Sequence, residues 1–221
     1  MTESSSTTPA DTAAVTRTSK RKAVRAVLAG GLVLGVGAAV TLAAWNDSEF
    51  VQGIFSAGSF NLQGSLTAGG TFTDHNSAGG AASLAFSIPV TNLAPGNTVY
   101  APYFVQLAAG TTTGANLTVA GLTATDSVSG AANAANLSYT VVPIAVGATC
   151  NAASVSGGTS ISSSNSLNTL GTPAGTVALT KGATATVAGA TQQLCFAITA
   201  SNNLVQGGVT TATWQLTAVS Q

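Results

Sequence analysis

Apolar residues alternate with polar residues at every second position in several stretches of the chain. The clearest of these runs cover residues 84–90, 99–107, 137–141, 194–198 and 212–218. Successive side chains of a β-strand point to opposite faces of a sheet, so a period of two predicts strands with one buried face. Weaker runs of the same kind lie at residues 60–66, 117–122, 177–179 and 183–187. No helical period of 3.6 residues follows position 45.

Turn-forming sequences such as 94–97 (APGN) and 207–208 (GG) separate these runs. Eight or nine short strands predict an all-β fold, a jelly-roll-like or Ig-like β-sandwich, preceded by an N-terminal signal helix. Residues 45–221 are expected to form this single domain, and the stretch 151–173, rich in Ser, Gly and Asn, a long loop. Proline in a strand predicts a local edge or bulge. Such points are expected at Pro89, Pro102 and Pro143.

The first 44 residues are typical of an export signal. Residues 1–25 are predicted to be a disordered N-terminus ending in a basic cluster, and residues 26–44 an uncharged signal-peptide helix. The helix ends in small residues, which signal peptidases require, so we predict recognition of Ala43 and Ala44 and cleavage before Trp45. The alternative is a retained membrane anchor, because a helix of this length is just able to span a bilayer core.

Charged residues make up only 5% of the chain, against about 25% in an average globular domain. Residues 26–221 contain one Lys and four carboxylates, a net charge of −3. Nucleic-acid binding needs a basic face, so a nucleic-acid partner is excluded. The only histidine is His75, placed in a loop, and the chain has no HExxH or GxSxG motif. We therefore predict no metal site, no cofactor and no enzymatic activity.

The two cysteines are Cys150 and Cys195. Thiols of exported proteins tend to pair, so we predict a disulfide between them. The bond closes a loop of about 46 residues, for which chain entropy gives at most about 4 kcal/mol of stabilisation. No basic side chain adjoins either cysteine in the sequence, which counts against a reactive thiol.

The residues on both sides of the predicted cleavage site form the most informative motif. Ala43-Ala44 is followed by Trp45-Asn46-Asp47 and then by residues 55–62 (FSAGSFNL). This pattern resembles the exported proteins that depend on a SipW-type signal peptidase, a group that includes the biofilm fibre protein TasA and camelysin. Residues 91–99 (TNLAPGNTV) are similar to an Asn-Leu-x-Pro-Gly-Asp turn in that group, with Asn97 at the Asp position. The resemblance implies a secreted structural protein with a jelly-roll-like sandwich.

Three functions remain open on these grounds. The first is a self-assembling fibre subunit of the cell surface or of an extracellular biofilm matrix, for which the low charge is favourable because it weakens self-repulsion. The second is a monomeric surface adhesin or glycan-binding module. The third is a camelysin-like metallopeptidase, against which the single His counts. The expected partners are a SipW-type signal peptidase during export and then further copies or matrix components, with membrane contact only through an uncleaved signal helix.

The segment freed by cleavage is the candidate assembly strand. Its large apolar residues are Trp45, Phe50, Val51, Ile54 and Phe55. A β-sandwich has open strand edges that accept an added strand, so the freed segment is able to pair with a neighbouring subunit. Alternatively, it folds back as the first strand of its own domain, where its apolar side chains fill the core. Fold-back has the advantage that it needs no partner molecule.

Overall fold

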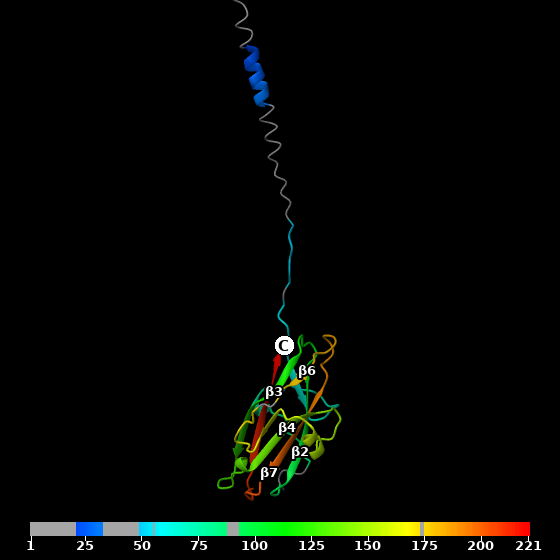
Figure 1. The fold of residues 1–221 in the computed structure, drawn as a ribbon, viewed down its shortest axis with the longest axis vertical. Helices are drawn as coiled ribbons and strands as arrows, with labels where there is room; N and C mark the ends of the chain where they lie inside the picture. The colour runs from blue at the N-terminus through cyan, green and yellow to red at the C-terminus, as the bar shows by residue number, and fades with distance from the viewer. Residues whose placement is uncertain (1–20, 33–48, 55, 88–92, 173–174) are drawn as a thin grey trace, which may run out of the picture. The chain divides into compact units, whose positions relative to one another are not determined.

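The computed structural model describes residues 21–32, 49–54, 56–87, 93–172 and 175–221 (Figure 1). The chain divides into two compact units, Met1–Phe55 and Ser56–Gln221. In the first unit residues 21–32 are helical, whereas residues 49–54 form neither helix nor strand. The predicted signal helix 26–44 is thus helical over its described part, and its remainder lies outside the described residues. Within the described ranges, no helix has the length and apolar character that crossing a membrane requires.

Strands paired antiparallel in two sheets make up the second unit. The five-stranded sheet has, in spatial order, β1 (Leu62–Ser65), β2 (Thr98–Leu107), β7 (Gln192–Ala200), β4 (Leu137–Ile144) and β5 (Ser162–Ser164). The three-stranded sheet has β6 (Val177–Leu179), β3 (Ala115–Asp126) and β8 (Thr210–Ser220). Figure 1 shows β2, β7 and β4 side by side. The fold is an all-β sandwich, as the alternation predicts.

The core lies between the two sheets and is built from the inward side chains of the long strands. Leu107, Leu117, Val119, Val141 and Leu194 are completely buried. β7 has strands on both sides and is buried along most of its length. Burying a Val or Leu side chain contributes roughly 1.5–3 kcal/mol. The central strands therefore account for most of the hydrophobic stabilisation.

Two of the three prolines occur where a neighbouring strand has ended. β1 pairs with β2 only from Phe104 onward, so Pro102 has a ladder partner only on the β7 side. β5 pairs with β4 only as far as Val141, so Pro143 likewise has a partner only on the β7 side. Proline lacks the N–H group that a second ladder would use, which explains these positions. Pro89 lies outside the described residues.

The stretch 151–173 is not a plain loop, contrary to the sequence prediction. It contains the short helix α2 (Ala152–Gly157) and the strand β5. Asn151 starts α2, because its side chain accepts the Ser154 backbone N–H at 3.0 Å while the Ser154 hydroxyl accepts the Asn151 N–H at 2.9 Å. This capping box satisfies N–H groups that a helix start leaves free. α2 packs on β4 and β7. Two 3-10 turns, η1 (Ala78–Gly80) and η3 (Ala134–Asn136), complete the unit.

Two predicted strands differ from the structure. Residues 183–187 form turns, because this loop doubles back on itself and Gly189 donates its N–H to Leu107 at 2.8 Å. Within 84–90, the described residues 84–87 belong to no strand, although Leu84 and Phe86 pack against the core. Alternation in this segment indicates only that one of its sides is buried. It does not require that the segment pairs with a neighbouring strand.

Candidate assembly site

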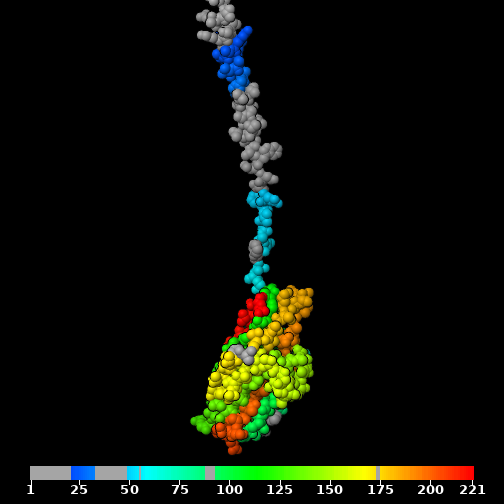
Figure 2. Space-filling view, viewed as in Figure 1, coloured from blue at the N-terminus to red at the C-terminus, as the bar shows by residue number. Residues whose placement is uncertain are grey.

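The residues predicted to direct cleavage, Ala43, Ala44 and Trp45, lie outside the described residues, and so does Phe55. The other members of the candidate assembly strand are described. Phe50, Val51 and Ile54 are 95%, 91% and 88% exposed. Figure 2 shows their segment in cyan. Large apolar side chains of this kind are normally buried, which makes the segment a candidate for an interaction.

The compact sandwich unit begins at Ser56. Fold-back of residues 45–55 onto this unit and strand addition to a neighbouring copy both stay predictions.

The longest open edge of the sandwich belongs to β8. Within the described residues this strand of 11 residues pairs with β3 on one side only. The other edge strands, β1, β5 and β6, have 4, 3 and 3 residues. β8 contains no charged residue and no proline, which are two devices by which proteins protect sheet edges. Its free N–H and C=O groups thus form a long unprotected template.

The core is incompletely covered along this edge. On the central strand β3, the inward residues Leu117 and Val119 are completely buried. The inward residues of β8 pack against the same core but are only partly buried. They are Ala212, Trp214, Leu216 and Ala218. An edge strand leaves one side of its inward side chains uncovered, so apolar surface remains available beside β8.

Trp214 lies at the centre of this surface. Its ring makes edge-to-face contacts with Tyr139 and Phe196, at centroid distances of 5.8 Å and 5.4 Å. Its indole N–H is buried and has no hydrogen-bond acceptor among the described residues. A buried indole N–H normally has a partner.

The sandwich has two different ends. Ser59, where the chain enters the domain, bridges to Thr111, and Gln221 donates its N–H to Gly114 at 3.0 Å. β8 finishes at this entry end, where Ser220 lies opposite Ala115. It starts at the far end of the sandwich, where Thr210 is paired with the last residue of β3. The open edge thus runs from the far end to the end at which the exposed segment joins the domain.

Asp126 closes the far end of the sandwich. Its carboxylate accepts the Thr210 hydroxyl and the backbone N–H groups of Asn133 and Ala134, the last two at 3.0 Å and 3.2 Å. The Thr210 hydroxyl and, to a lesser degree, these N–H groups hold the pKa of Asp126 below its ordinary value, although partial burial opposes them. The sequence gives no sign of this role, which depends on a contact across 84 positions.

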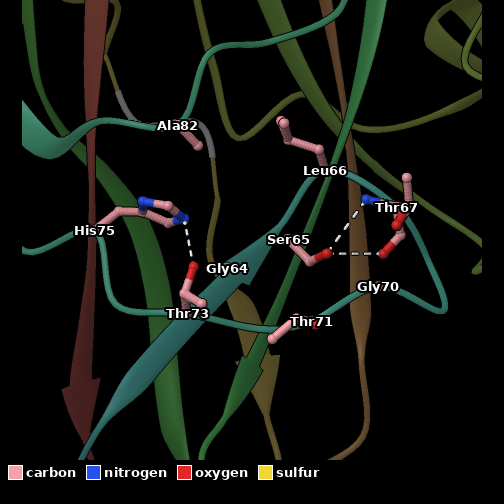
Figure 3. Close-up of a pocket in the computed structure, with 9 residues that line it drawn as sticks. All are labelled: Gly64, Ser65, Leu66, Thr67, Gly70, Thr71, Thr73, His75 and Ala82. Carbon is pink, nitrogen blue, oxygen red and sulfur yellow. Dashed lines mark hydrogen bonds between the residues drawn. The ribbon is translucent and has the colours of Figure 1, made fainter.

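His75 lines a shallow hollow of about 280 Å³ beside β1 (Figure 3). Its Nδ1 lies 3.0 Å from the Gly80 carbonyl, and its Nε2 lies 3.1 Å from the Thr73 hydroxyl. The Ser65 hydroxyl donates to the Thr67 carbonyl at 3.0 Å. These contacts hold the loop after β1 closed, so His75 has the place in a surface loop that the sequence predicts. Among the described residues no group of three metal-ligating side chains is present.

Cys150 and Cys195 form the predicted disulfide, with Cα atoms 5.3 Å apart. Cys195 lies on the central strand β7 and is completely buried. Cys150 directly precedes the capped start of α2, so the bond fixes this helix to the sheet. Disulfides of this kind are typical of proteins that fold in an oxidising environment.

Comparison of the chain with protein-family models gives no match, and comparison with curated proteins gives none either.

Proposed function

We propose that the protein is a secreted structural subunit of the cell surface or extracellular matrix, which assembles into fibres after removal of its signal peptide at Ala44. The segment freed by cleavage, residues 45–55, adds as a strand to β8 of a neighbouring copy. One observation carries the proposal: an exposed apolar segment and a long, incompletely covered strand edge occur in the same chain. Each supplies what the other lacks.

The direction of the strands supports head-to-tail assembly. β8 runs from the far end of the sandwich to the entry end. If the entry end of one copy faces the far end of the next, the segment preceding Ser59 extends along β8 of that next copy. Read from N- to C-terminus, the segment then runs opposite to β8, so the pair is antiparallel. Antiparallel pairing is the arrangement of all six pairs among the strands β1 to β8.

Charge and compartment are also consistent with the proposal. The residues from Ser56 to the C-terminus contain only Asp74, Asp126 and Lys181 as charged side chains, so repulsion between closely stacked copies is weak. The Cys150–Cys195 disulfide fits folding outside the cytosol. Export through a SipW-type signal peptidase is the route that the cleavage motif implies.

The first experiment compares a chain that starts at Trp45 with one that starts at Gly58. Electron microscopy and light scattering are expected to show fibres for the longer chain and monomers for the shorter one, with the same circular dichroism spectrum. A second control keeps the length but replaces Phe50, Val51 and Ile54 by Ser, and it is expected to remain monomeric. Fibres from this serine variant, or monomers from the Trp45 chain, would contradict the proposal. Monomers from the chain that starts at Trp45 would favour a monomeric adhesin.

The second experiment measures occupation of the edge directly. The chain has two Trp residues, so the form that starts at Gly58 retains only Trp214, which lies beside the proposed site. A peptide of residues 49–57 contains no Trp and is expected to change the Trp214 emission in a saturable way. The same peptide with Phe50, Val51, Ile54 and Phe55 replaced by Ser is the matched control and should give no change. An unchanged emission with both peptides counts against strand addition at β8.

A further inference from the structure

The outer face of the three-stranded sheet consists largely of threonine, and Thr123, Thr125 and Thr211 on it are exposed. Outward residues of β3 and β8 alternate with the inward residues that pack on the core. Three cross-strand threonine pairs result from the register of these strands. They are Thr118 with Thr217, Thr123 with Thr213, and Thr125 with Thr211. We call this surface, with Asn116, Gln215 and Val219, the threonine face.

The face is continuous across the one irregularity of the β3–β8 ladder. The register shifts between Val119 and Gly121, where β3 has an extra residue. An ideal Cβ on Gly121 would lie 2.9 Å from Gln215 Oε1, so the Gln215 side chain lies over this glycine. The bulge therefore leaves no gap, because a long side chain from the neighbouring strand covers it.

No ionised side chain lies within this part of the described surface. β8 and β6 contain no charged residue, and the only one in β3 is Asp126 at its end. The carboxylate of Asp126 is already bonded to Thr210 and to two backbone N–H groups. At the opposite end of the face, Val219 is 61% exposed. Covering the face therefore requires no desolvation of free charge, and it buries apolar surface that is now in water.

From these observations we infer that the threonine face is a self-association surface, on which two copies of the chain pack face to face. Threonine suits such an interface because its branched side chain has few rotamers to lose on burial. Its methyl groups fill the space between the sheets, while its hydroxyl groups bond across the interface or back to the strand. The Thr118 hydroxyl, for example, donates to the Thr217 carbonyl of the neighbouring strand at 3.4 Å.

The area of the face predicts how this association depends on the number of copies that take part in it. A strand of 11 residues is about 36 Å long, and two strands with their margins are about 10 Å wide, so each copy offers roughly 400 Å². Two copies then cover roughly 800 Å², which is less than the ~1,200 Å² at the lower end of stable interfaces. Single copies are therefore expected to remain monomeric, whereas rows of copies associate through many weak contacts.

Stacked copies in a fibre would repeat the threonine face along the fibre axis. In this respect the inference rests on the proposed function. Strand addition uses the edge of β8, and face-to-face packing uses its outward side chains, so the two contacts do not compete. The consequence is lateral bundling of fibres, with the threonine faces of neighbouring fibres in contact. Bundling is expected to be nearly independent of salt, because charged groups do not mediate it.

The test places charges on the face without changing its fold. Thr123→Glu with Thr213→Glu puts two carboxylates opposite each other on the face, and solvent is available to both positions. The matched control is Thr140→Glu with Thr199→Glu, which adds the same charge to the outer surface of the five-stranded sheet. Circular dichroism checks that both variants fold. In electron micrographs, wild type and control are expected to form bundles, and the face variant single fibres of the same width.

A second readout separates this inference from fibre formation. Microspheres are coated densely with the mature chain in which Phe50, Val51 and Ile54 are replaced by Ser, so that strand addition between spheres is removed. Spheres carrying this chain should clump, and adding Thr123→Glu and Thr213→Glu should slow clumping at least tenfold, whereas the Thr140→Glu and Thr199→Glu pair should not. The inference is overturned if spheres with either pair of Glu substitutions clump equally fast. It is also overturned if spheres that carry neither pair do not clump. Absence of fibres together with face-dependent clumping contradicts only the proposed fibre function.

Discussion

Replacing Tyr139 by Phe removes a single buried hydroxyl that joins three parts of the domain. This hydroxyl lies 2.9 Å from the hydroxyl of Ser162 on β5, and it accepts the backbone N–H of Gly171 at 2.7 Å. Tyr139 is 2% exposed and Ser162 is completely buried. In the Phe variant both partners lose this contact at a site that water does not reach. β5 and the chain after it would then lose their hydrogen bonds to the Tyr139 side chain, while the backbone ladder between β4 and β5 remains.

The magnitude follows from the number of groups left unpaired. Each buried polar group without a partner costs roughly 1–3 kcal/mol, so two such groups give an expected loss of about 2–6 kcal/mol in the free energy of unfolding. For a domain of this size each kcal/mol lowers Tm by about 2–4 °C, which corresponds to a decrease of roughly 4–24 °C. Urea titration followed by circular dichroism measures the free energy, and a thermal scan measures Tm.

A matched substitution makes the result specific. The Tyr103 hydroxyl lies under Gly64 and has no hydrogen bond within the described residues, so Tyr103→Phe is expected to change the stability by less than about 1 kcal/mol. Adding Ser162→Ala to Tyr139→Phe removes one of the unpaired groups and should recover part of the loss. Equal effects of the two Tyr→Phe substitutions, or a loss below about 0.5 kcal/mol for Tyr139→Phe, would refute the reasoning.

Three further predictions concern stability. Asp126→Asn should destabilise the domain by about 1–2 kcal/mol at neutral pH. The lowered pKa of Asp126 in the folded state means that this contribution is present above about pH 4 and is lost as pH falls through the folded-state pKa, so acid titrations of wild type and variant should converge. Cys150→Ala should cost about 2–4 kcal/mol, and a thiol titration of the unreduced, unfolded wild type should detect no free thiol. Gly64→Ala should cost about 1–3 kcal/mol in a urea titration, because the new Cβ meets the Tyr103 hydroxyl, and Tyr103→Phe in the same chain should recover part of it.

Periodicity predicted the strands that are long and half-buried. β2, β4, β7 and β8 follow the clear alternating runs, because each has one face on the core. The disulfide was also predictable, since a chain with two cysteines has only one intramolecular pairing. Strand order was not, because ladders such as β2–β7 join residues about a hundred positions apart.

The elements that sequence reasoning missed are short and depend on distant partners. β5 consists of three serines, which have no apolar alternation, and it forms because β4 offers a partner at 139–141. α2 had a readable signal in the Asn151-to-Ser154 spacing of its capping box. The apolar segment before the domain was identified from its composition. The acceptor that we propose for it, the open edge of β8, becomes visible only when the described strands are placed.

The position of β7 in the chain has a consequence for the timing of folding. β7 is the central strand of the larger sheet and one end of the disulfide, yet it comprises residues Gln192–Ala200 of a chain of 221. β2 and β4, which it joins, do not pair with each other. The larger sheet is thus unable to close until nearly the whole chain has been synthesised. Under the export route that we propose, this order is favourable, because no complete sandwich forms before the last strands are made and the chain stays able to pass through a translocation channel as an extended thread.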